Sequence, residues 1–187
     1  MNKADAITLF RTALVFLVAY LILIRFDAYA TIAIIAIMFI LDFGDGYAAK
    51  KDLKKGKKLS WYGKRLDVAG DRVTEYVLWI LFTFLGIVPL FMLFLIVLRH
   101  SFADALMGAK GTSSKMKSRF AKVFYTSNAS RGGIGIVKFI TFSYLSWAYI
   151  TSNLFGRYLL FSYVLISILF AYIMVRGIAE IYEAVKQ

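Results

Sequence analysis

Six apolar runs, each about as long as one bilayer crossing, dominate the sequence. They cover roughly residues 6–24, 29–50, 60–86, 90–107, 134–151 and 158–180. An α-helix rises ~1.5 Å per residue, so about 20 apolar residues cross the ~30 Å hydrocarbon layer. Hydrophobic residues make up 60% of the 187, which is far more than soluble domains contain. The sequence therefore predicts an all-α polytopic membrane protein, with six transmembrane helices in a single domain over residues 1–187.

Lysine and arginine gather on one side of these predicted helices. Six lysines lie between residues 50 and 58, and a second basic segment spans residues 108–133. Loops rich in Lys and Arg usually stay in the cytoplasm. We therefore expect a multi-pass protein of the cell (plasma) membrane whose active site and two termini face the cytoplasm. The net charge of +12 suits anionic membrane lipids and anionic substrates.

Composition also excludes two kinds of chemistry. Nucleic acid is not an expected partner, because no basic groove with aromatic platforms stands apart from the apolar runs. The chain contains no cysteine, so disulfides, thiolate metal sites and a cysteine nucleophile are ruled out.

Four aspartates interrupt the second and third apolar runs at a similar predicted depth. Asp42 and Asp45 are three residues apart and Asp67 and Asp71 are four apart, so each pair shares one helix face. A charged side chain at the centre of a membrane helix costs about 2.5–3.5 kcal/mol, which calls for a compensating cation. Mg²⁺ or Mn²⁺ prefers such hard oxygen ligands and often also binds a substrate phosphate. The four carboxylates therefore predict a divalent-metal site in a polar cavity, with chemistry at phosphorus.

Small residues accompany the aspartates at regular offsets. The pattern reads Asp-x2-Asp-Gly-x2-Ala-Lys, a spacer, and then Gly-x3-Asp-x3-Asp; its residues are Asp42, Asp45, Gly46, Ala49, Lys50, Gly63, Asp67 and Asp71. This stretch resembles the signature of the CDP-alcohol phosphotransferases, six-helix membrane enzymes of phospholipid synthesis. Ser60 fits a hydroxyl residue that often precedes the second glycine, and residues 5–11 are similar to the Asn-x2-Thr-x2-Arg opening of the family's first helix.

The resemblance implies a role for each matching residue. Asp42, Asp45 and Asp67 would bind Mg²⁺ or Mn²⁺, and Asp71 would be a further ligand or the base that deprotonates the acceptor alcohol. The implied contacts to the CDP-linked lipid are Asp5, Thr8, Arg11, Gly46, Ala49, Lys50, Ser60 and Gly63. The reaction implied is attack of an alcohol on the β-phosphate of that lipid, which releases CMP and leaves a phosphodiester.

Three positions depart from the family pattern. Lys50 stands where the family usually has arginine, which keeps the charge but loses the two-pronged contact to phosphate. Twelve residues separate Lys50 from Gly63, instead of about eight, and a surface loop absorbs this at small entropic cost. Asp5 replaces the usual asparagine. These departures concern the nucleotide contacts rather than the metal site.

Basic residues later in the chain predict a pocket for the acceptor. Lys138 and Arg176 lie within apolar runs, where a cation is a functional candidate by default; Arg99 and Arg131 lie toward the same side. These charges favour a phosphorylated polyol, glycerol phosphate or inositol phosphate, as acceptor. Serine, free inositol and an aminoalcohol remain alternative acceptors. Lys138 has an alternative role as well, in which its side chain only extends to the membrane surface.

The expected partners follow from this interpretation. They are a CDP-linked lipid donor, either CDP-diacylglycerol or its archaeol counterpart, a small polar alcohol acceptor, the surrounding lipids and a second copy of the chain in a homodimer. The alternative of another class is a cation-coupled transporter. It predicts an inverted repeat, but the acidic cluster has no counterpart in residues 100–187.

Overall fold

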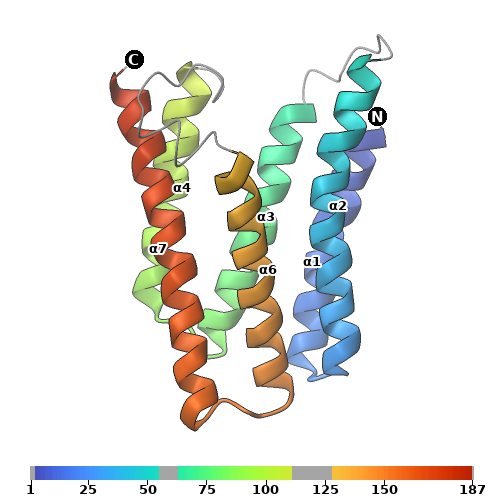
Figure 1. The fold of residues 1–187 in the computed structure, drawn as a ribbon, viewed down its shortest axis with the longest axis vertical. Helices are drawn as coiled ribbons and strands as arrows, with labels where there is room; N and C mark the ends of the chain where they lie inside the picture. Colours follow the sequence, from blue (N-terminus) through green and yellow to red (C-terminus); the bar gives the residue numbers. More distant parts are fainter. Residues whose placement is uncertain (1–2, 55–62, 111–127, 187) are drawn as a thin grey trace. The chain divides into compact units, whose positions relative to one another are not determined.

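A computed structural model describes residues 3–54, 63–110 and 128–186 of the chain. These ranges form six helices and contain no strand. The helices are α1 (Lys3–Leu23), α2 (Ala28–Lys54), α3 (Gly63–Phe84), α4 (Leu90–Lys110), α6 (Asn128–Ile150) and α7 (Gly156–Lys186) (Figure 1). Each predicted apolar run corresponds to one helix, so the all-α prediction is confirmed.

Two helices extend beyond the predicted runs. Helix α6 begins at Asn128, because its first turn is tied to α7 by hydrogen bonds from Tyr172 and Arg176 to the carbonyl of Ser130. Helix α7 continues to Lys186, and its last turns still contain buried residues, among them Glu183. Burial in the fold therefore carries both helices past the point where the sequence turns polar.

Three of the described helices are long and apolar enough to cross a membrane. They are Asp5–Leu23, Gly132–Ile150 and Gly156–Lys186, with mean hydropathies of 2.2, 1.3 and 2.3. The apolar part of α2 among the fully described residues, Ala28–Asp42, is shorter. The chain is thus a helical membrane protein by the length and composition of these segments.

The helices form two compact units. The first unit comprises Met1–Phe82 and Phe142–Leu154, and the second comprises Thr83–Thr141 and Phe155–Gln187. The first therefore contains α1, α2, nearly all of α3 and the C-terminal end of α6. The second contains α4, the N-terminal part of α6 and α7.

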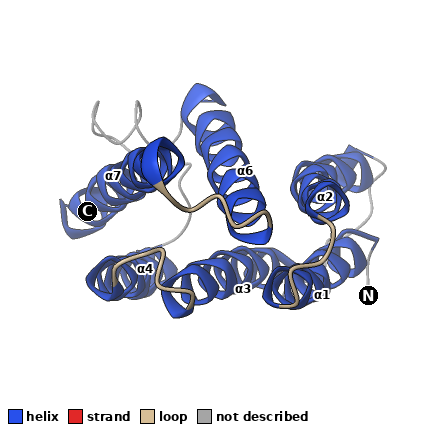
Figure 2. Ribbon diagram, turned by 90° about the horizontal axis from the view of Figure 1, so that it is seen from below, coloured by secondary structure: helices blue, strands red, loops and turns tan. Residues whose placement is uncertain are grey.

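In the first unit, α1 and α2 lie side by side (Figures 1 and 2). A short link joins them, and the Asp27 carboxylate caps α2 by accepting a hydrogen bond of 2.7 Å from the backbone N–H of Ala30. Helix α3 joins the end of α6 through aromatic packing. The Phe142 ring lies edge-on to Trp79, with centroids 5.8 Å apart, and stacks on Phe82 at 6.1 Å.

In the second unit, α4 packs against α7 (Figures 1 and 2). Both helices bury apolar side chains, including Ile96 of α4 and Leu169 of α7. Gly177 allows the two helices to approach, because a Cβ at this position would lie 2.6 Å from Cδ of Arg99. The Arg99 side chain therefore lies directly across the α7 backbone.

Candidate active site

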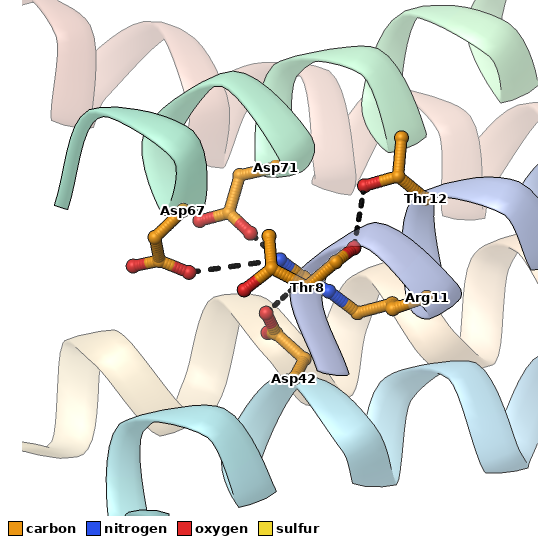
Figure 3. Close-up of polar contacts among 6 residues, drawn as sticks. All are labelled: Thr8, Arg11, Thr12, Asp42, Asp67 and Asp71. Carbon is orange, nitrogen blue, oxygen red and sulfur yellow. Dashed lines mark hydrogen bonds and ion pairs between the residues drawn. The ribbon is translucent and has the colours of Figure 1, made fainter. Parts of the chain in front are cut away.

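Arg11, in the third turn of α1, lies among three of the four predicted aspartates (Figure 3). Its Nη1 contacts Oδ1 of Asp42 and lies 2.8 Å from Oδ1 of Asp71. Its Nη2 lies 3.7 Å from Oδ1 of Asp67. The Arg11 side chain is 3% exposed, whereas the three carboxylates are 35–48% exposed. A buried cation thus draws together carboxylates that solvent can still reach.

Gly70 allows α3 to come this close to α1. A Cβ at Gly70 would lie 2.9 Å from both Oγ1 of Thr12 and Cγ2 of Thr8, a distance that real Cβ contacts do not adopt. Glycine has no Cβ, so the α3 backbone rests on these two threonines. The sequence analysis assigned no role to Gly70, although a glycine inside a helix, next to Asp71, is the usual sign of a close backbone approach.

The predicted donor-binding residues of α1 share one buried face. Asp5, Thr8 and Arg11 follow at intervals of three residues, and all three are buried. The Thr12 hydroxyl donates a hydrogen bond of 2.8 Å to the carbonyl of Thr8. The polar face of α1 is therefore turned toward the protein, as a binding face requires.

Several predicted residues lie outside the described parts of the structure. The backbone of α2 runs through Asp45, Gly46, Ala49 and Lys50, but their side chains are not described. Asp45 follows Asp42 by three residues within the continuous helix α2. Ser60 falls in the undescribed range 55–62, and the side chain of Arg131 is likewise not described. Gly63 is the first residue of α3 and is half-buried. The roles assigned to all these residues stay predictions.

The described side chains include no group of three or more His, Cys, Asp or Glu residues that could hold a metal ion as they stand. Instead, Asp42, Asp67 and Asp71 face one cationic group of the protein, the guanidinium of Arg11. Carboxylate oxygens that already surround a cation are the donor set that Mg²⁺ and Mn²⁺ prefer. The residues therefore fit such an ion in chemical type, and metal binding stays a prediction.

Two of the predicted acceptor residues have partners within the second unit. Nη2 of Arg99 lies 3.1 Å from Oε2 of Glu180, and both side chains are buried. Nη1 of Arg176 donates hydrogen bonds to the carbonyl and the hydroxyl of Ser130, at 3.0 and 2.9 Å. Lys138 lies on α6 and is half-buried. The sequence analysis did not predict that Arg99 pairs with Glu180. The only indication in the sequence is that Glu180 is an acidic residue near the end of the last apolar run.

The chain has helices of membrane-crossing length, and acidic side chains gather around a cation between α1, α2 and α3. These features define a helical membrane protein with a polar site among its helices. A family model described as CDP-alcohol phosphatidyltransferase matches residues 1–183, nearly the whole chain. The chain belongs to this family, whose members transfer a phosphatidyl group from a CDP-alcohol, and the resemblance inferred from the sequence is confirmed. Comparison with curated proteins and with solved structures found no match.

Proposed function

We propose that this protein transfers a phosphatidyl-type or archaetidyl-type group from a CDP-linked lipid to the hydroxyl of a small polar alcohol, in phospholipid biosynthesis. The observation that carries the proposal is the convergence of Asp42, Asp67 and Asp71 on one point beside α1. These residues come from both halves of the family signature. Their meeting in space is what a shared metal site beside a diphosphate requires.

The proposed metal ligands are Asp42, Asp45, Asp67 and Asp71, with Mg²⁺ or Mn²⁺ as the ion. When bound, such an ion neutralises charge on the donor phosphates. The proposed nucleotide and lipid contacts remain Asp5, Thr8, Arg11, Gly46, Ala49, Lys50, Ser60 and Gly63. Burial of the polar face of α1 supports the first three of these.

Asp71 is the proposed general base. Its carboxylate is 46% exposed, so a water-soluble alcohol can reach it. In the proposed reaction, Asp71 takes the hydroxyl proton while the alcohol oxygen forms a bond to the β-phosphorus. The bond from that phosphorus to the oxygen of CMP breaks, and CMP leaves with the electron pair.

The proposed acceptor is a phosphorylated polyol, glycerol phosphate or inositol phosphate, held by Arg99, Arg131, Lys138 and Arg176. The charge of these residues supports this choice. Serine, free inositol and an aminoalcohol are the alternatives. We also propose six membrane crossings, a cytoplasmic active site, cytoplasmic termini, a plasma-membrane location and a homodimer.

The test is release of CMP from CDP-diacylglycerol, and from its archaeol counterpart, by the purified protein in detergent. Each donor is paired with each acceptor, with Mg²⁺, with Mn²⁺ and with chelator. We expect release only with a divalent ion, and Asp71→Asn to lower the rate by about 10²–10⁴-fold, the usual contribution of a general base.

Asp27→Asn is the matched control, because Asp27 caps α2 at its other end and asparagine caps equally well. Its rate should equal that of the unchanged protein. Full activity of Asp71→Asn would remove Asp71 as the base. No CMP release with any donor and acceptor would contradict the transferase and favour the cation-coupled transporter.

A further inference from the structure

The protein supplies its own positive charge at the place where the signature carboxylates converge. Arg11 is 3% exposed, and its two terminal nitrogens face Asp42, Asp67 and Asp71 (Figure 3). All four residues belong to the first compact unit. Without a cation among them these carboxylates would repel one another, so the guanidinium stabilises their arrangement in the metal-free protein.

The guanidinium and a divalent ion compete for the same carboxylates. Oδ1 of Asp42 and Oδ1 of Asp71 both contact the single nitrogen Nη1. An ion such as Mg²⁺ draws its ligand oxygens to about 2.0–2.1 Å in near-octahedral geometry. The carboxylates cannot close around an ion in this way while Nη1 remains between them.

We propose that Arg11 is a built-in cation, which holds the aspartates together in the metal-free protein and gives them up when a divalent ion binds. This inference rests on the proposed function, because that function brings the ion to the aspartates. Metal binding is then an exchange of one cation for another. Its apparent affinity is lower than the carboxylates alone would give, by the strength of their interaction with Arg11.

The displaced guanidinium needs a new anion, because a buried and unpaired charge is strongly unfavourable. The diphosphate of the CDP-linked lipid is the anion that the proposed function brings, and a guanidinium fits phosphate through two parallel hydrogen bonds. Arg11 thus changes partners from carboxylate to phosphate. Metal and nucleotide should then bind with positive coupling, and the coupling must be reciprocal.

The test measures binding of Mn²⁺ alone to metal-stripped protein in detergent, by electron paramagnetic resonance of the free ion. Arg11→Gln removes the competing charge, so we expect Mn²⁺ to bind at least about fivefold more tightly than to the unchanged protein, the lower end of typical coupling. The metal-free variant should also unfold at a lower temperature. Arg11→Lys keeps a cation but loses the two-pronged contact, so its Mn²⁺ affinity should lie between the two.

Arg25→Gln is the matched control for charge. Arg25 lies in the α1–α2 link, where its Nη1 donates a hydrogen bond to Ser152 at 2.9 Å. Removing this charge should leave the Mn²⁺ affinity unchanged. If Arg11→Gln does not fold, the comparison of Arg11→Lys with the unchanged protein decides the question.

Equal or weaker Mn²⁺ binding by the Arg11 variants would overturn the inference. If the unchanged protein then still binds Mn²⁺ and releases CMP, the proposed function stands and the exchange alone is wrong. If neither the unchanged protein nor any variant binds Mn²⁺, the exchange and the proposed metal site fail together. Binding of Mn²⁺ by Arg11→Gln but not by the unchanged protein would support the exchange strongly.

Discussion

Gly70 of α3 rests directly on Thr8 of α1: a Cβ on the glycine would come within 2.9 Å of Cγ2 of the threonine. Asp71 follows Gly70 in the chain and lies 2.8 Å from Arg11, three residues after Thr8. The closeness of the two backbones thus determines whether the acidic residues of α3 reach the cation on α1.

Gly70→Ala should therefore weaken both the fold and the site. Overpacking at a buried contact costs about 1–3 kcal/mol, and over most of this range the cost is larger than the ~1 kcal/mol that alanine gains over glycine in a helix. Thermal unfolding in detergent and CMP release measure the two effects. Gly132→Ala on α6 is the matched control, since its Cβ would meet nothing within 4 Å. Equal stability of the two variants would show that α1 and α3 are not in this close contact.

The buried pair of Arg99 and Glu180 should show strong coupling in a double-mutant cycle. Arg99→Met or Glu180→Met alone leaves one buried charge without this partner, at a cost of about 3–5 kcal/mol in unfolding free energy. The double variant leaves neither charge, so its loss should be smaller than the sum of the single losses by about 0.5–3 kcal/mol. Chemical unfolding in detergent measures all four proteins. Additive losses would mean that the two side chains do not interact.

Substitutions at Arg176 and Tyr172 can show whether Arg176 binds the acceptor or only connects α7 to α6. Tyr172 and Arg176 both donate hydrogen bonds of 3.0 Å to the carbonyl of Ser130. Tyr172→Phe removes one of these bonds without changing charge, and should cost only about 0.5–1.5 kcal/mol of stability. Arg176→Met should in addition raise KM for a phosphorylated acceptor about tenfold or more, as expected for a lost charged contact of ~1.5 kcal/mol.

The measurement is steady-state CMP release at varied acceptor concentration. A change of KM in Arg176→Met and not in Tyr172→Phe supports the pocket. If both variants lose stability and keep their KM, Arg176 ties α7 to α6 and does not bind the acceptor.

The proposed orientation in the membrane is open to labelling, because the chain has no native cysteine. Thr151, in the connection between α6 and α7, and Lys186, at the end of α7, are both exposed. A membrane-impermeant maleimide should label Thr151→Cys in intact cells, and Lys186→Cys only after permeabilisation. The same reagent applied to the cysteine-free protein gives the background. The reverse pattern would place the active site on the outer side.

Much of the helical architecture could be predicted because it depends on local properties. Runs of about 20 apolar residues predict helices in a membrane, and each run corresponds to a described helix. Helical periodicity also predicts that Asp67 and Asp71 share a face, and both contact Arg11. The ends of the helices were harder to predict. Glu183, for example, is a charged residue that tertiary packing nevertheless buries.

Contacts between helices could not be predicted in the same way. Sequence reasoning placed Arg11 at the donor phosphates and did not predict the contacts of its guanidinium with Asp42 and Asp71. It placed Arg99 in the acceptor pocket, which stays a proposal, and did not predict the pairing of Arg99 with Glu180. Both charges were recognised as important, but their partners are 31 or more residues away in the chain.

The amino-acid order alone was enough to establish the helical segments, the membrane setting and the acidic signature, since hydrophobic length and the 3.6-residue period act within a single helix. Only the packed structure showed that Arg11 is the cation among the aspartates and that Gly70 allows α3 to approach it. The rotation and approach of α1, α2 and α3 depend on side chains meeting across helices, as Gly70 meets Thr8. No periodicity within one helix encodes such a meeting.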